Sequence, residues 1–326
     1  TIPRTVVLST DIFDEFMENN DLYKIALSDA SDEVILNHFV EARLPNRVYN
    51  DLYTFISFVT NPIAVRSSSK LEDSHYQPFA GIYSTYMIPK VANDSKLTIK
   101  MLTDAIKCVY ASVYFKTSKA YMAATSNVID EEKMGIILQE VCGSEFGKRF
   151  YPTFSGVARS INFYPIGPEK PEDGIANVAV GLGKSIVEGG VSLRFSPKYP
   201  KKVLQLSSPE MALRDTQKQL YALNLNPEAF YPSTDDGINL EKISIRTAEK
   251  DGCLKYVAST FDFENHVLRD GPNYNGKKVV TFSNILNHET FPLARILQTL
   301  LKIGQDEMNT PIEIEFAVCL NVPKDH

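Results

Sequence analysis

Apolar and polar residues along this chain repeat with two different periods, one typical of helices and one of strands. Residues 99–120 have the clearest helical pattern, with Leu102, Ile106, Val109 and Val113 recurring every three or four positions. Short apolar runs predict buried strands at RTVVLST, NPIAVRSSS, GIYSTYMIP, GIILQEV, TFSGVARSINFYP, IANVAVGLG and PIEIEFAV. Strands and helices mixed along one chain favour an α/β or α+β architecture.

Three further segments predict helices with recognisable ends. DIFDEFMENNDLYKIAL begins at Asp11, and either Thr10 or Asp11 is a suitable N-cap. SSPEMALRDTQKQLYAL begins with Ser208 as cap and Pro209 at the first helical position. TFPLARILQTLLKIG ends at Gly304, which we expect near the C-cap.

Length, charge and cysteine spacing limit the classes of protein that fit. The 326 residues suggest roughly two domains. A net charge of −6 argues against a nucleic-acid binder with a dominant basic face. No apolar run reaches the ~18 residues of a membrane span, and no signal-peptide pattern opens the chain, so we expect a cytoplasmic protein. The four cysteines form no CxxC pair, which argues against a zinc site or a dithiol motif.

An arginine, three serines and a later glycine occupy residues 63–85, IAVRSSSKLEDSHYQPFAGIYST. Arg66 offers a permanent charge and a planar fork of donors, which suits phosphate oxygens. Gly81 lets a backbone N–H approach a phosphate closely, and Thr85 adds a hydroxyl. The alternative is an ordinary polar loop in which Arg66 pairs with Glu72 or Asp73.

Two glutamates alternate with apolar residues in PIEIEFAV. On a strand, Glu313 and Glu315 share one face, roughly 7 Å apart, while Phe316 lies on the opposite face, which we expect to be buried. Hard cations such as Mg²⁺ prefer carboxylate and phosphate oxygens, so the pair is a candidate metal site. The alternative is a half-exposed strand with two solvated glutamates.

Other nucleotide and metal motifs fail on spacing. GLGK at residues 181–184 lacks the first glycine of a P-loop, and Ile186 breaks the GxGxxG pattern. The five histidines form neither HxH nor HExxH, so a histidine metal site is not indicated.

Taken together, the segments resemble the ATP-grasp nucleotide-binding region of the pyruvate phosphate dikinase and phosphoenolpyruvate synthase family. VRSSSKLED is similar to the family's VRSSATAED, FAGIYST to FAGQxxT, and ILQEV to the VQxMV hinge strand. SGVARSIN resembles SGVAFTxN, VGLGKSIVEGG resembles GLGExVVxG, and PIEIEFAV resembles P-x-D/E-I-E-W/F. The motifs occur in family order and cover nearly the whole chain.

The resemblance implies a two-lobed ATP-grasp fold with mixed sheets and a cleft between the lobes. An N-terminal lobe, residues 1–125, would carry the phosphate loop, and residues 126–326 would carry the hinge and metal strands, with the boundary near residues 123–133. Arg66 would act on the ATP phosphates, lined by Gly81 and Thr85. Gln139 would lie beside adenine and ribose, and Glu315, with Glu313 beside it, would hold Mg²⁺.

The resemblance further implies a kinase or phosphotransferase that uses ATP to phosphorylate a histidine on a separate domain. That domain and an acceptor-binding domain are expected in the parent chain, without nucleic-acid or membrane partners. The family's GGKG loop, which precedes the first strand, and its later QxRP segment have no counterpart here, and Lys184 stands where the family usually has Glu. We therefore expect a region that is truncated at both ends and inactive alone. A non-catalytic regulatory module and a sibling dikinase with another acceptor remain alternatives.

Overall fold

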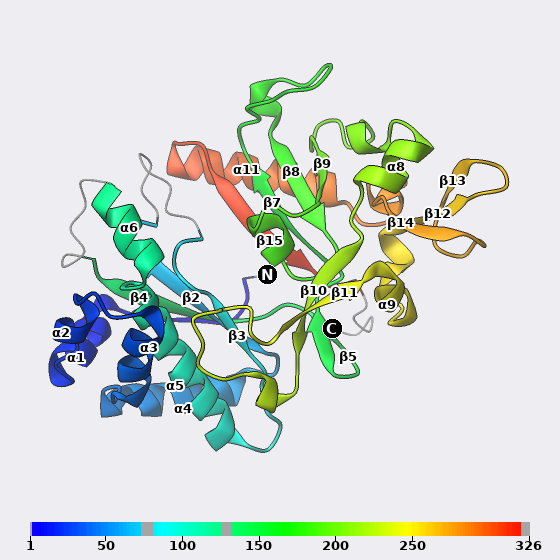
Figure 1. Ribbon diagram of the computed structural model, residues 1–326. Coiled ribbons are helices and arrows are strands. Elements are labelled where there is room, and N and C mark those ends of the chain that lie inside the picture. Colours follow the sequence, from blue (N-terminus) through cyan, green and yellow to red (C-terminus); the bar gives the residue numbers. More distant parts are fainter. Residues whose placement is uncertain (1, 73–80, 125–131, 321–326) are drawn as a thin grey trace. The chain divides into compact units, whose positions relative to one another are not determined.

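The computed structural model describes residues 2–72, 81–124 and 132–320 of the chain (Figure 1). They form two compact units. Unit 1 comprises residues 1–141 and 223–240, and unit 2 comprises residues 142–222 and 241–326. The mixed α/β composition predicted from the sequence is confirmed. Within the described residues, no helix has both the length and the apolar character that a membrane crossing requires.

Unit 1 is built on a sheet with strand order β1-β4-β2-β3, in which each neighbouring pair is antiparallel (Figure 1). Its strands are β1 Thr5–Leu8, β2 Ile63–Ser69, β3 Tyr86–Ile88 and β4 Met134–Glu140. Its helices are α1 Thr10–Asn19, α2 Tyr23–Ala26, α3 Asp32–Glu41, α4 Asn46–Phe58, α5 Ser95–Ser112 and α6 Lys116–Ala124.

The core of unit 1 lies between the sheet and α5. Leu102, Ile106, Val109 and Val113 are all 0% exposed, so the apolar stripe predicted from the sequence is core packing. The predicted helix is interrupted, because α5 ends at Ser112 and α6 begins at Lys116. Burial of this apolar surface of α5 against the sheet is the main favourable contribution to the stability of the core.

Two details of the first predicted helix differ from expectation. The N-cap of α1 is Ser9 rather than Thr10 or Asp11. The helix stops at Asn19, and Asp21 adopts a left-handed backbone conformation with φ 49°, after which α2 begins at Tyr23. The prediction of one continuous helix was therefore wrong, because Asn and Asp tolerate the left-handed backbone conformation that ends a helix.

Within the described residues, unit 2 contains three further sheets, with strand orders β15-β7-β8-β9, β11-β10-β6-β5 and β13-β12-β14. Its first strands are β5 Ser144–Phe146, β6 Arg149–Tyr151, β7 Phe154–Arg159, β8 Ile175–Ala179, β9 Leu193–Phe195 and β10 Gln219–Asn224. The remainder are β11 Leu240–Ser244, β12 Ala258–Asp262, β13 Val267–Asp270, β14 Lys277–Val280 and β15 Glu313–Val318. Its helices are α7 Lys184–Val187, α8 Pro209–Asp215, α9 Ile245–Lys250, α10 Ser283–Leu286 and α11 Leu293–Met308.

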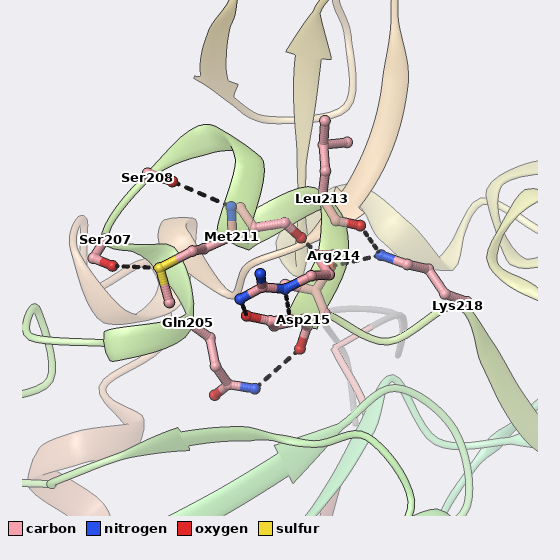
Figure 2. Close-up of polar contacts among 10 residues, drawn as sticks. Gln205, Ser207, Ser208, Met211, Leu213, Arg214, Asp215 and Lys218 are labelled. Carbon is pink, nitrogen blue, oxygen red and sulfur yellow. Dashed lines mark hydrogen bonds and ion pairs between the residues drawn. The ribbon is translucent and has the colours of Figure 1, made fainter.

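Helix α8 is shorter than its sequence pattern suggested, and Figure 2 shows how both of its ends are held. Ser208 accepts a hydrogen bond from the Met211 N–H, which confirms the predicted cap. At the other end, Lys218 donates to the Leu213 carbonyl, as a cation at a helix C-terminus does. The residues after Asp215 leave the helix and enter β10.

Helix α11 passes through Gly304 and ends four residues later at Met308. Its C-cap is Asn309, with φ 51°, so the expected glycine cap was wrong. Gly304 serves packing instead, because a Cβ atom there would lie 2.3 Å from Ile312 Cδ1. A side chain at this position would force the Ile312 side chain, in the segment that leads into β15, to move.

The division into units differs from the expected lobes in the placement of two segments, strand β4 and residues 223–240. Most of the expected boundary, residues 125–131, lies outside the described residues. Strand β4 pairs with β1 and β2 and belongs to unit 1, so Gln139 shares a unit with Arg66 instead of with Glu315. Residues 223–240 also return to unit 1, a long-range excursion with no local sequence signal.

Candidate functional site: one face of the first sheet and the strand of Glu315

Strand register in unit 1 brings two predicted site residues to one face of the sheet. Gln139 on β4 lies opposite Ala64 on β2 and opposite Thr5 on β1. Arg66 lies two residues beyond Ala64 and faces Ile137. Since opposite residues share a face and alternate residues along a strand do too, Arg66 and Gln139 point to the same side.

The other side of the same strands is the one that the helices cover. Val65 and Leu138, which alternate with Arg66 and Gln139, are both 0% exposed. Arg66 and Gln139 themselves are partly exposed. The burial of one face thus fixes the orientation of the polar residues, because a one-residue slip would turn the apolar set outward.

Gln139 stands near the end of β4 beside a partly buried carboxylate. Its Nε2 donates to Thr5 Oγ1 at 3.2 Å. The next residue, Glu140, accepts from the N–H groups of Thr60 (2.9 Å) and Asn61 (3.0 Å) and lies 3.8 Å from Arg4. Burial works to raise the pKa of Glu140, but these N–H bonds and the Arg4 charge outweigh it and lower the pKa below its ordinary value.

The serine row after Arg66 belongs to β2 rather than to a loop, because the strand continues to Ser69. The Ser67 hydroxyl donates to Glu72 Oε1 at 3.0 Å, and the Glu72 N–H donates to Ser69 Oγ at 3.3 Å. These bonds fold the chain back immediately after the strand. Asp73, the other expected partner for Arg66, lies outside the described residues, as do residues 79 and 80 of FAGIYST.

Gly81 and Thr85 follow on the way to β3. Gly81 has φ +80°, and a Cβ atom built there would meet nothing within 4 Å. Glycine is thus needed for its backbone conformation and not for space. Thr85 directly precedes Tyr86, whose register partner is Val65, so Thr85 enters the sheet next to the strand position of Arg66.

A segment far away in sequence supports this corner of unit 1, and the sequence gave no sign of it. Asp236 Oδ2 accepts from the Thr85 N–H at 2.9 Å. Asn239 Nδ2 donates to the Met87 carbonyl at 2.7 Å, and the Tyr86 hydroxyl donates to the Ser233 carbonyl. Residues 223–240 therefore act as a strap on β3, and Asp236 is a positioning residue for Thr85.

In unit 2, the candidate metal strand β15 is an edge strand that, among the described residues, pairs only with β7. Glu315 lies opposite Val157 and Glu313 opposite Arg159. Both glutamates are exposed, and they share a face as predicted. Glu313 accepts from Arg159 Nε in an ion pair whose side chains are 46% and 52% exposed, respectively.

The opposite face of β15 differs from expectation. Phe316 is only partly buried, so its predicted full burial was wrong. As an edge strand, β15 lacks a neighbour on one side that would cover the ring. Phe316 still packs closely, since a Cβ atom on Gly156, its register partner, would lie 2.2 Å from its Cζ. Gly156 in SGVAR is therefore required by the ring above it.

The donor set around Glu315 decides which cation fits. Within residues 2–72, 81–124 and 132–320, no group of three His, Cys, Asp or Glu side chains gathers as a protein-only metal cage would require. Mg²⁺ does not need such a cage, because it binds through one or two carboxylates together with substrate phosphates and water. A single exposed carboxylate at Glu315, with Glu313 held by Arg159, fits that mode of binding.

Lys184, which departs from the family pattern, lies in a small charged cluster of unit 2. Its Nζ is 3.3 Å from Glu188 Oε1, and Glu188 also accepts from the Tyr221 hydroxyl at 2.6 Å. Lys242 lies over the Tyr221 ring at 4.9 Å. Lys184 thus has a structural partner in Glu188, which stabilises the turn of α7.

Comparison with known proteins identifies the family. The family model of the pyruvate phosphate dikinase AMP/ATP-binding domain matches residues 1–324 of the sequence, and the chain belongs to this family. Over 191 residues, or 59% of the chain, it is 28% identical to the uncharacterized phosphotransferase YvkC of Bacillus subtilis (strain 168). The alignment covers 20% of that relative, so the chain spans about a fifth of its length. The resemblance inferred from the sequence motifs is confirmed.

Proposed function

We propose that this chain binds Mg-ATP and activates it for phosphorylation of a histidine on a separate domain, in a dikinase-type phosphotransferase. Family membership supports the nucleotide. The observation that carries the site is the register that sets Arg66 and Gln139 on one face of the first sheet. A phosphate-binding cation and an amide donor then stand on the same side of two paired strands.

Each residue has a distinct part in this proposal. Arg66 contacts the phosphates, where a planar guanidinium pairs well with their oxygens. Thr85, positioned by Asp236, and the backbone at Gly81 line the loop over them. Gln139 lies beside the adenine and ribose. Phosphoryl transfer needs little covalent help from protein, so placement and charge neutralisation are the work of these groups.

Glu315 is the residue that would hold Mg²⁺, with Glu313 next to it on the same face of β15. The ion supplies neutralisation of the phosphate charge when it is bound. We expect Glu315 to contribute most of the metal affinity, as the resemblance of PIEIEFAV to the family's P-x-D/E-I-E-W/F strand implies. The relative's description as a phosphotransferase favours an enzyme over a purely regulatory module.

The test measures Mg-ATP and metal-free ATP binding to the intact protein by calorimetry, together with phosphohistidine formation. Arg66→Met should weaken ATP binding about 10- to 100-fold with or without Mg²⁺, given ~1.5–3 kcal/mol for hydrogen bonds to charged groups. Arg47→Met is the matched control, because Arg47 pairs with Glu15 on the surface. Glu315→Gln should abolish most of the advantage that Mg²⁺ gives, while metal-free ATP binding stays unchanged.

Two further variants sharpen the metal assignment. Glu313→Gln should reduce the Mg²⁺ effect less than Glu315→Gln does, and Glu172→Gln, an exposed glutamate elsewhere in unit 2, should change nothing. If Arg66→Met binds ATP as tightly as Arg47→Met, the phosphate role is wrong. If Glu315→Gln keeps the full response to Mg²⁺, the solvated-strand interpretation of β15 holds instead.

A further inference from the structure

Two cysteines that are 177 positions apart in the sequence meet in unit 2. Cys142 Sγ and Cys319 Sγ are 2.9 Å apart. Cys142 lies just ahead of β5, and Cys319 directly follows Val318, the last residue of β15. Both side chains are partly exposed, so a small oxidant in solution has access to the pair.

The backbone around Cys319 is fixed independently of the thiols. The register of β15 with β7 reaches Val318, which lies opposite Phe154. The N–H of Leu320 donates to Thr153 Oγ1 at 2.9 Å, so the residues on both sides of Cys319 are tied to β7 or its start. Cys142 Sγ is also 3.9 Å from the Ala317 carbonyl oxygen. The approach of the two sulfurs therefore follows from the sheet and not from a flexible end.

The remaining cysteines behave differently. Cys108 and Cys253 are each 0% exposed, and burial raises the pKa of their thiols to about 12 and about 11, respectively. Thiolate is the reactive form, so both are inert towards oxidants in the folded protein. The Cys142–Cys319 hydrogen bond, in which either sulfur can be the donor, lowers the pKa of Cys142, and this favours Cys142 as the nucleophile.

We propose that Cys142 and Cys319 form a reversible disulfide, a modification site separate from the ATP-binding role. The geometry requires little movement, since bonded sulfurs are about 2.05 Å apart. A low-molecular-weight disulfide of the glutathione type is the oxidant. The Cys142 thiolate attacks one of its sulfurs and releases one thiolate; Cys319, losing its proton, then attacks the mixed disulfide at the Cys142 sulfur and releases the second.

The electron balance of this exchange is complete. The protein loses two electrons and two protons, and the oxidant disulfide becomes two thiols. The new bond joins the first residue of unit 2 to the residue after its edge strand β15. Because a cross-link over a long loop restricts the unfolded chain, oxidation should raise the melting temperature, and dithiothreitol should reverse the rise.

The experiment equilibrates the intact protein in buffers of reduced and oxidised glutathione, blocks free thiols with N-ethylmaleimide, and maps peptides by mass spectrometry without reduction. The expected product is one cross-linked peptide pair containing Cys142 and Cys319, with two thiols lost and Cys108 and Cys253 unmodified until unfolding. The higher melting temperature should be absent in Cys142→Ser and Cys319→Ser, each of which should carry a single glutathione instead.

Three results would overturn the disulfide. The first is wild-type protein that keeps four titratable thiols in oxidised glutathione. The second is wild-type protein that carries two separate glutathione adducts with no cross-link. A rise in melting temperature that persists in both serine variants would also contradict it. The wild-type cross-link needs no variant to fold, so the peptide map decides the matter even if a serine substitution impairs folding.

Discussion

The strand that carries Gln139 and the strand that carries Glu315 have opposite positions in their sheets. Strand β4 lies between β1 and β2, whereas β15 is at the edge of its sheet and, in the part of the chain that the structure describes, pairs only with β7. In β4 the residues alternating with Gln139 are fully buried, Ile136 and Leu138 both at 0% exposure. In β15 the equivalent residues, such as Phe316, are only partly buried.

This difference shows how firmly the core fixes each candidate site residue. A central strand with one dry face has a single acceptable register, so Arg66 and Gln139 are oriented by the apolar residues between them. An edge strand is held on one side only, and its glutamates are fixed by fewer contacts. The residues proposed to bind phosphate in unit 1 should thus be held rigidly, while the glutamates proposed to bind the metal in unit 2 should depend more on their ligands.

The largest expected effect is Leu138→Ala in the central strand. Removing a fully buried leucine leaves a cavity in well-packed surroundings, and we expect a loss of about 3–5 kcal/mol in the free energy of unfolding. Urea denaturation followed by circular dichroism measures it. A loss below about 1 kcal/mol would show that β4 does not form part of a tightly packed core.

Phe316→Ala in the edge strand should cost less, about 2 kcal/mol, below the ~3–5 kcal/mol of a fully buried ring. The ring is partly exposed but still covers Gly156. The same denaturation experiment serves, with Phe263→Ala as control, because that ring is 57% exposed. If Phe316→Ala matched Leu138→Ala, the contrast between edge and central strands would fail.

The same contrast explains how much of the fold and of the candidate site could be predicted from the sequence. The α5 stripe, the strand of Arg66 and the alternation in EIEFAV were all visible, because each depends on a local period. The family was recognisable because its motifs are short and ordered along the chain. The partial burial of Phe316 was not predictable, since alternation reports which face a residue takes but not whether the strand is central.

Contacts between distant residues were missed for a related reason. Asp236 reaches Thr85 across 151 positions, and Cys142 reaches Cys319 across 177. Cysteine spacing alone argued against a dithiol, because a single sequence reveals a cysteine pair only when the two residues form a local motif such as CxxC. Sheet registers create the proximity here, and registers are set by tertiary packing.

The smallest expected effect concerns Glu140, which extends the comparison from apolar residues to carboxylates. Its side chain is 13% exposed and accepts from two N–H groups and the Thr60 hydroxyl, whereas Glu313 on β15 is 46% exposed and pairs with Arg159. The pKa of Glu140 is lower in the folded protein than its ordinary value of 4.5. Its ionised form therefore stabilises the fold above that pH, and this contribution is lost as pH falls through the lowered folded pKa.

Glu140→Gln should reduce the free energy of unfolding by about 1 kcal/mol at neutral pH, since the amide oxygen keeps part of the hydrogen bonding but not the charge. Below the folded pKa of Glu140 the difference from wild type should shrink, because the wild-type carboxyl is then also neutral. Denaturation curves from about pH 3 to 7 measure this, with Glu313→Gln expected to change stability by less than ~0.5 kcal/mol at every pH, as an exposed ion pair does. A Glu140→Gln curve that runs parallel to wild type over the whole range would show that the N–H cradle does not favour the ionised carboxylate. The end of β4 would then be no better fixed than β15.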